Sequence, residues 1–533
     1  MKQLKNICMS LLAVALLTTA CSDFLEEDPL GQQTDQNFFN DETNAILAIN
    51  AIYDVLAWDE GPGNFGVYVP HNYEFFYGDI LSDDAAKGSS RSDFRELADL
   101  ESWVATPTNG PAGGSWTNNF TGIARANEAI ANLPDATIGE ELKTRLIGEA
   151  KFLRAYFYFY QVRLFGGVPL FAEPIKPSEF GQVGRASISE VYALIEQDLT
   201  DAIAALPEKS QYAAEDMGRA TKGAARAYLA RAIMYQIGTD NSNGHNWGEV
   251  LTYTNEVINS GEYSLMGNFA EIFEDEGENG VESIFEIQTL ESTEAWGAVK
   301  TGTTANIFQN NRSLWGWGFN NPTQSLVDEF ETGDPRLAST AYADGDIVLG
   351  ILQEIDFPAE NETGFLSRKA AVVQPVTTKA AGQNIRKFRY ADILLMKAEA
   401  AFHTGDEASA RQILNDIRDR ARSSTRPKGS VEGSLTYEPY SAADLNGVLP
   451  PVLGTVSGQD LLNAIMHERR VELAMESLRF WDQVRTGTFI SSLPADAQGA
   501  AQARAITGVN PIPVLPIPLN EVQTWNLEQN PGY

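Results

Sequence analysis

The chain has 533 residues, with 39 basic and 72 acidic side chains and a formal net charge of −33. A negative field of this size repels phosphate backbones and anionic lipid headgroups, so it argues against nucleic acid and against electrostatic membrane attachment. The length allows a large core, and stability is expected to come from packing, because Cys8 and Cys21 are the two cysteines.

The N-terminus has the pattern of an export signal. Lys2 and Lys5 precede an apolar stretch over 7–17, and small residues over 18–20 lead to Cys21. This stretch is shorter than the ~20 apolar residues that span a bilayer. It resembles a bacterial lipoprotein signal, which predicts removal of residues 1–20 and lipid attachment at Cys21. Thr18 stands where such signals usually carry Leu, so ordinary secretion with Cys21 as a free thiol is the alternative.

Residues 21–40 are predicted to form a flexible arm. Its acidic segment from Asp23 to Asp28 resembles signals that send some lipoproteins to the outer surface of an outer membrane, although a solvated linker would look the same.

Beyond the arm, helical periodicity dominates both ends of residues 41–533. Helices are predicted over 45–58, 118–133, 140–165, 189–206, 221–237 and 247–258, and again over 385–402, 407–422 and 459–485. Residues 261–384 instead show short β-prone runs such as 283–287, separated by Gly, Asn and Thr. We therefore expect a helical scaffold over about 41–260 and 385–533, with an irregular lobe between its two parts.

Two segments have the size and texture of tetratricopeptide units. Residues 388–422 form two helices around a Gly405-Asp406 turn, and residues 223–258 form a similar pair. Small alanines recur on the first helix of each pair, where two helices must approach closely. Ordinary antiparallel hairpins are the alternative, but the two pairs together favour a helical repeat.

Four segments carry a family resemblance. They are EAKFLRAYFYFYQVRLFGGVPL from Glu149, RKFRYADILLMKAEAAF from Arg386, HERRVELAMESLRFWDQVRTG from His467 and LPIPLNEVQTWNLEQNPGY from Leu515. In sequence, order and spacing they closely resemble signatures of the SusD (RagB) family of outer-membrane, nutrient-binding lipoproteins.

The resemblance implies a mostly α fold, a right-handed superhelix of tetratricopeptide-like helix pairs with a less regular ligand-binding lobe containing short strands. It also implies a lipid-anchored protein at the cell surface that binds glycan without catalysis and needs no cofactor. Such a protein acts as the lid of a SusC-like TonB-dependent outer-membrane transporter. Peptide or other nutrient capture by the same scaffold is an alternative, and a secreted hydrolase is a more distant one.

Aromatic residues in loops are the ligand-binding candidates, because sugar C–H faces pack on aromatic rings while polar side chains bond the hydroxyls. If residues 314–320 are extended, Trp315, Trp317 and Phe319 share one side. The full set of candidates is Trp296, Trp315, Trp317, Phe319, Asn320, Tyr73, Asn72, Asp83 and Trp103. Core packing is the competing explanation for each of them. Trp116, Trp247, Trp481 and Trp525 lie in predicted helices or the tail and are expected in the core.

Nothing in the sequence identifies a catalytic or metal site. The four histidines are scattered, and no nucleophile-elbow motif occurs. The charges over 467–485 instead predict local helical ion pairs between Arg469 and Glu472, Glu476 and Arg479, and Asp482 and Arg485.

Overall fold

The computed structural model describes residues 38–58, 69–291, 302–359, 361–373, 381–508 and 510–533. Cys21, the leader and Trp296 lie outside these ranges. None of the helices within the described part of the chain is both long and apolar enough to cross a membrane.

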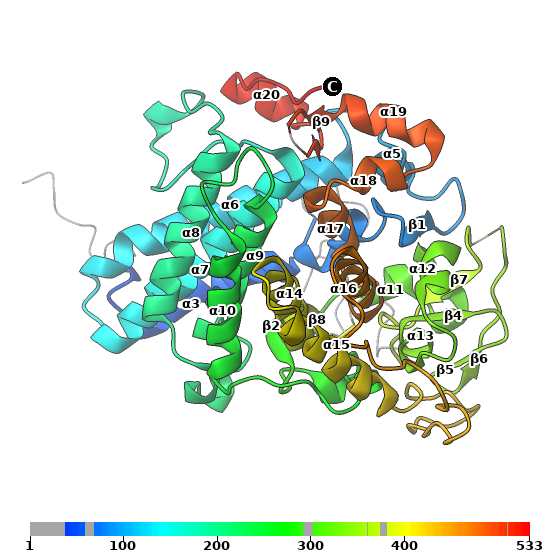
Figure 1. Cartoon of the computed structure of the whole chain (residues 1–533). Coiled ribbons are helices and arrows are strands. Elements are labelled where there is room, and N and C mark those ends of the chain that lie inside the picture. Colours follow the sequence, from blue (N-terminus) through cyan, green and yellow to red (C-terminus); the bar gives the residue numbers. More distant parts are fainter. Residues whose placement is uncertain (1–37, 59–68, 292–301, 360, 374–380, 509) are drawn as a thin grey trace, which may run out of the picture.

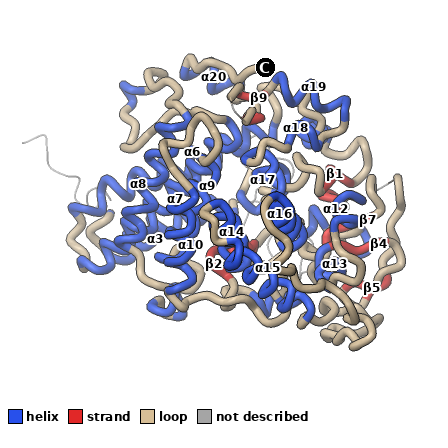
Figure 2. Tube along the Cα trace, viewed as in Figure 1, coloured by secondary structure: helices blue, strands red, loops and turns tan. Residues whose placement is uncertain are grey.

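Long helices form a continuous stack (Figure 1, Figure 2). They are α3 (Glu42–Asp54), α6 (Gly110–Asn132), α7 (Glu140–Phe165), α8 (Ile188–Ala205), α9 (Lys222–Gln236), α10 (Trp247–Asn259), α14 (Tyr390–His403), α15 (Glu407–Arg422) and α16 (Gln459–Glu472). From α6 to α10 each helix contacts the next, and α10 then contacts α14, which packs on both α15 and α16. The stack therefore continues across the intervening lobe, which confirms the mostly α, tetratricopeptide-like fold.

Short elements fill the lobe and the edges of the molecule. The short helices are α4 (Phe75–Gly78), α5 (Arg95–Glu101), α11 (Ala305–Gln309), α12 (Gln324–Glu329), α13 (Pro335–Thr340), α17 (Arg479–Arg485), α18 (Phe489–Ser492), α19 (Ala495–Ala503) and α20 (Leu519–Trp525). All the strand pairs of the described residues are antiparallel: β1 (Ala85–Gly88) with β3 (Phe319–Pro322), β2 (Ser283–Ile287) with β8 (Ile385–Arg389), β4 (Ala341–Ala343) with β7 (Phe365–Ser367), β5 (Ile347–Val348) with β6 (Ile351–Leu352), and β9 (Ala505–Ile506) with β10 (Ile512–Pro513).

Local sequence explains the boundaries of the main helices. Ser187 and Glu190 form a capping box at the start of α8, in which the Glu190 N–H donates to the Ser187 hydroxyl at 3.3 Å and the Ser187 N–H donates to the Glu190 carboxylate at 2.8 Å. Gly166, with φ +71°, ends α7, and Gly405, with φ +88°, makes the turn between α14 and α15. From Phe152 to Gln161 every side chain of α7 is buried, as expected for the central helix of the core.

Two predicted elements are wrong in detail. Residues 385–389 form strand β8 rather than the start of a helix, because they pair with β2. The helix expected over 459–485 is interrupted between α16 and α17, where Met475 and Ser477 have φ of +58° and +62°. The backbone of Ser477 lies so close to Gly78 that a Cβ there would stand 2.1 Å from the Ser477 carbonyl oxygen. This contact between distant segments accounts for the break.

Buried ion pairs join the lobe to the scaffold. Arg336 of α13 donates to Glu468 at 2.6 Å and to Glu472 at 3.1 Å, both on α16. Of the predicted local pairs, that between Asp482 and Arg485 is present at 2.8 Å, whereas Arg469 binds both Asp482 and the distant Asp392. The charges of this region therefore connect separate elements more than they stabilise one helix.

Candidate functional site

Trp315 is the most exposed of the predicted aromatic ligand residues that the structure describes, with 54% of its surface accessible. It follows a short 3-10 turn over Arg312–Leu314 and has φ +62°. The backbone after it is held tightly, because the N–H groups of Gly316 and Gly318 donate to the carbonyls of Asn311 and Asn310 at 2.8 and 2.9 Å. A Cβ on Gly316 would lie 1.9 Å from the Asn310 carbonyl oxygen, so only glycine fits. The tight loop leaves the indole facing outward.

A cavity of about 300 Å³ adjoins this loop. It is lined by Asn311, Arg312, Gly318, Asp344, Glu354, Ile355, Asp356, Asn361 and Leu366. Glu354 and Asp356 are exposed, so their carboxylates can accept hydrogen bonds from ligand hydroxyls. Arg312 lies 3.7 Å from Asp93, which brings the segment after β1 to the same region. Trp315 is not in the cavity wall itself but stands on the same loop, between the lining residues Arg312 and Gly318. We call this cavity together with Trp315 the Trp315 site.

Phe357, which no pattern in the sequence marks as a ligand candidate, is a second exposed aromatic side chain, next in the chain to a residue that lines the cavity. It follows Asp356 directly and is 58% exposed. No repeated aromatic pattern marks this position in the sequence, so only its exposure distinguishes it from a core phenylalanine.

The expected aromatic row over 315–319 does not form. Residues 312–315 turn instead of extending, and only 319–322 are a strand, so Trp315 points away while Phe319 is buried against Phe308, with ring centres 5.2 Å apart. Trp317 is half-buried and lies edge-on to the same ring at 4.7 Å. Asn320 is buried and donates to Asp79 at 3.1 Å and to Gln309 at 2.8 Å. These placements give Phe319 and Asn320 structural roles.

The two aromatic candidates from the N-terminal part of the chain, Tyr73 and Trp103, are buried. Tyr73 is fully buried and stacks on Phe76, with ring centres 5.3 Å apart. Trp103 is 1% exposed and packs against Phe480 and Phe489. A ring enclosed on both faces cannot receive a sugar, so the expectation that Tyr73 and Trp103 bind ligand is corrected to a core role.

Asp83 is engaged by arginine instead of facing an open pocket. The Arg479 guanidinium donates to its two carboxylate oxygens at 2.7 and 2.9 Å. This bidentate geometry is typical of a structural pair.

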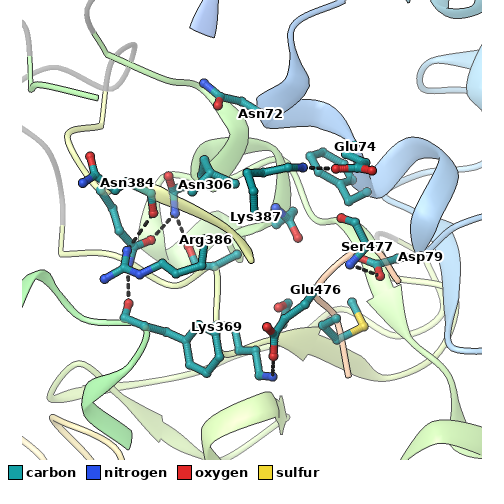
Figure 3. A pocket seen from close by; sticks show the side chains of 18 of the residues that line it. Asn72, Glu74, Asp79, Asn306, Lys369, Asn384, Arg386, Lys387, Glu476 and Ser477 are labelled. Carbon is teal, nitrogen blue, oxygen red and sulfur yellow. Dashed lines mark hydrogen bonds and ion pairs between the residues drawn. The ribbon is translucent and has the colours of Figure 1, made fainter. Parts of the chain in front are cut away.

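Asn72 lies in a separate, internal polar pocket (Figure 3). It is 3% exposed, and neither amide atom has a hydrogen-bond partner within the described part of the chain. Around it, Lys387 pairs with Glu74, and Lys369 donates to Glu476 at 2.7 Å. The cavity has a volume of about 80 Å³, enough for a few water molecules but not for a sugar ring. We interpret it as a hydrated junction between the lobe and the scaffold.

Among the described residues, no three His, Cys, Asp or Glu side chains are grouped so that they could hold a metal ion. The Trp315 site offers ring stacking combined with hydrogen bonding by carboxylates, two amides and a guanidinium.

Comparison with known proteins identifies the family. Residues 281–533 match the model described as "SusD family", and residues 23–234 match the one described as "Starch-binding associating with outer membrane". The chain belongs to the SusD family.

Relatives of the same kind align over nearly the whole chain. "SusD-like protein P25" from Formosa agariphila is 25% identical over 549 residues, covering 95% of this chain and 94% of the relative. The structure of a "Laminarin binding SusD-like protein" is 28% identical with a TM-score of 0.71, covering 93% of this chain and all of the other. A "Surface glycan-binding protein A from Bacteroides thetaiotaomicron in complex with laminarihexaose" is 25% identical with a TM-score of 0.71, over 92% and 99% of the two chains.

Proposed function

We propose that this protein is a cell-surface lipoprotein that binds a neutral glycan without altering it. The observation that carries the proposal is the exposed indole of Trp315 on a loop that also lines a cavity with carboxylate, amide and guanidinium groups. A glycan needs both an apolar platform for its C–H faces and partners for its hydroxyls. Two similar structures support the same ligand class, because one is named as laminarin binding and the other as a complex with laminarihexaose.

The transport role forms the second part of the proposal. The leader and Cys21 would attach the body to the outer membrane by lipid, and the family resemblance suggests that it closes over a SusC-like TonB-dependent transporter. In this role the protein captures glycan and passes it on, so it requires affinity but no turnover.

Binding to a panel of polysaccharides tests the ligand class. The chain from residue 21 onward, with Cys21→Ser to prevent acylation, is run on affinity gels containing laminarin, starch or mannan and is then titrated calorimetrically. We expect retention by at least one glycan and no release of reducing ends. Failure to bind any glycan, combined with peptides that copurify from native extracts, would favour peptide capture. Reducing ends that accumulate with time would indicate a hydrolase.

The membrane role is tested in cells. Surface proteolysis of intact bacteria should remove the wild-type protein, and Cys21→Ser should release it from the membrane fraction. If the protein closes over a SusC-like transporter, that transporter should copurify with the wild-type protein from detergent-solubilised outer membranes. A wild-type protein that is soluble in the periplasm would contradict this part of the proposal.

A further inference from the structure

A second, larger cavity lies on the outer side of α6, far from the Trp315 site. It has a volume of about 490 Å³, within the roughly 300–1,000 Å³ of small-molecule sites. Its walls come from α6, from the segment over 169–180 and from α20. In Figure 1, α6 and α20 lie at the upper left and top, whereas β4–β7 of the lobe lie at the lower right. We call it the aromatic cavity.

Aromatic rings from these three segments line the aromatic cavity: Trp116, Phe120, Phe171, Phe180 and Trp525. Neighbouring ring centres are 4.9 Å apart for Trp116 and Phe120, 5.8 Å for Phe120 and Phe171, and 5.4 Å for Phe171 and Trp525. Phe180 extends the row, with its ring centre 5.6 Å from that of Trp525 and 59% of its surface exposed. The sequence predicts a core position for both Trp116 and Trp525; Trp116 is indeed only 3% exposed, whereas Trp525 is half-buried.

The walls of the aromatic cavity are held in place by buried polar contacts. The Asn127 amide donates to the carbonyl oxygens of Phe171 and Glu173 at 2.9 and 3.3 Å. Arg154 donates to the carbonyl of Ala172 at 2.7 Å and is itself bound to Asp198. The backbone that carries Phe171 is thus fixed against α6 and α7. A preformed cavity loses less conformational entropy when a ligand binds.

Carboxylates give the aromatic cavity its polar character. The side chain of Glu521 interacts with the indoles of both Trp116 and Trp525, and partial burial raises the pKa of its carboxyl group despite these hydrogen bonds. Glu128 is exposed at the lining. Arg125 also lines the cavity, but it already lies 3.6 Å from Asp54. An anionic ligand would therefore meet two acids and one paired cation in a protein of net charge −33, so charge argues against it. A purely aliphatic ligand would cover Glu521 without offering a donor, which is costly.

We propose that the aromatic cavity is a second glycan-binding site, in which a short stretch of neutral sugar stacks on Trp525 and Phe180 and donates hydroxyl hydrogen bonds to Glu521 and Glu128. A sugar ring supplies both the C–H face and the donors that these walls require. The ligand class rests on the proposed function, but the position does not, because the two cavities share no residue. One long glycan chain, or two chains, could then be held at separated points, which increases avidity.

Site-resolved NMR tests this proposal. The chain from residue 21 onward is labelled with 5-fluorotryptophan, the ¹⁹F resonances of Trp315 and Trp525 are assigned by Trp→Phe variants, and laminarihexaose is added. If a polysaccharide of the panel other than laminarin is bound, a hexasaccharide of that polysaccharide serves as a second probe. We expect both resonances to shift, and the Trp525 resonance to shift also in a Trp315→Ala background. Phe180→Ala should weaken binding at Trp525 about tenfold, the scale of losing one stacking ring, while the exposed Leu519→Ala on α20 should not.

The outcomes separate this inference from the proposed function. If Trp315 responds to sugar and Trp525 does not at saturation, the second site is overturned and the proposed function stands. If neither responds and calorimetry shows no binding to any glycan, the proposed function is overturned, and this inference with it. A Trp525 resonance that responds to a lysine-rich peptide but not to sugar would show a cation site and would also overturn the inference. Because Phe180 is exposed, its replacement should leave the fold intact, which unchanged thermal unfolding would verify.

Discussion

Arg389, the last residue of β8, donates a hydrogen bond from Nη1 to Oε1 of Glu472 at 2.7 Å, and both side chains are buried. Glu472 ends α16, so this pair joins the sheet at the edge of the lobe to the helical stack. Burial by itself raises the pKa of Glu472, but Arg420, Arg389 and Arg336 outweigh it, and the pKa lies well below its ordinary value. Three arginines therefore share this carboxylate, although each also has another acidic partner: Glu468 for Arg336, Glu476 for Arg389 and Glu282 for Arg420.

We expect Glu472→Ala to destabilise the protein strongly. Removal of Glu472 leaves the buried cluster of arginines and carboxylates short of one negative charge, and breaking a buried pair in this way typically costs about 3–5 kcal/mol. The free energy of unfolding from urea titration measures this loss. Asp444→Ala is the matched control, because Asp444 and Arg426 form an exposed pair at 3.4 Å that should contribute less than about 1 kcal/mol. Equal, small losses in both variants would contradict a structural role for the buried pair.

Gly122 sets the distance between α6 and α7. A Cβ at this position would lie 2.3 Å from the ring of the fully buried Phe157, so Gly122→Ala should force the helices apart and cost about 1–3 kcal/mol. Gly113 lies on the same helix with no atom within 4 Å of such a Cβ. Gly113→Ala should therefore raise stability by up to about 1 kcal/mol through its helix propensity. Thermal unfolding of the two variants should shift in opposite directions, and shifts of the same sign would refute the close approach.

The elements that could be predicted from the sequence are those with local determinants. Helix α7 has the predicted bounds because two glycines follow a continuous apolar surface, and β2 has them because β-prone residues stand between turn residues. Strand β8 could not be recognised, since its partner β2 lies about a hundred residues earlier in the chain. The interruption after α16 likewise depends on Gly78, which is remote from Ser477 in sequence.

The candidate site was only partly predictable for the same reason. Trp103 and Trp315 both lie outside the long helices and have positive φ, so local features do not separate them. Phe480 and Phe489 bury Trp103, whereas a glycine-restricted loop leaves Trp315 exposed. Which tryptophan faces solvent is decided by contacts between distant segments.

Asp79 should make stability depend on pH. Burial raises the pKa of its carboxyl group to about 7. Hydrogen bonds from Asn320 and Ser477 lower this pKa in part, while the nearby charge of Asp84 raises it and that of Lys369 lowers it. The unfolded chain, with an ordinary pKa near 4, binds fewer protons than the folded protein between about pH 4 and 7. Stability from this group therefore falls as the pH rises through that window, by up to about 1.4 kcal/mol per pH unit.

Asp79→Asn removes this proton equilibrium while keeping an oxygen that can accept from the Ser477 N–H, which lies 2.8 Å from the aspartate. The difference in unfolding free energy between the variant and the wild type should grow in favour of the variant from pH 4 to 7 and then level off. Urea titrations at several pH values measure it, and the other ionisable groups cancel in the comparison. Parallel curves would show that Asp79 keeps an ordinary pKa.

Trp315 and Trp103 should respond in opposite ways to replacement by alanine. Trp315→Ala should weaken glycan binding by about 1–3 kcal/mol, by analogy with bases stacked on aromatic side chains, and leave stability within about 0.5 kcal/mol because the ring is exposed. Trp103→Ala should cost about 3–5 kcal/mol of stability, because it empties a space packed against Phe480 and Phe489, and leave the affinity of the folded protein unchanged. Calorimetric titration with the glycan and urea unfolding on the same samples give both numbers. If the Trp103→Ala variant bound glycan more weakly while remaining as stable as the wild type, the assignment of Trp103 to the core would be wrong.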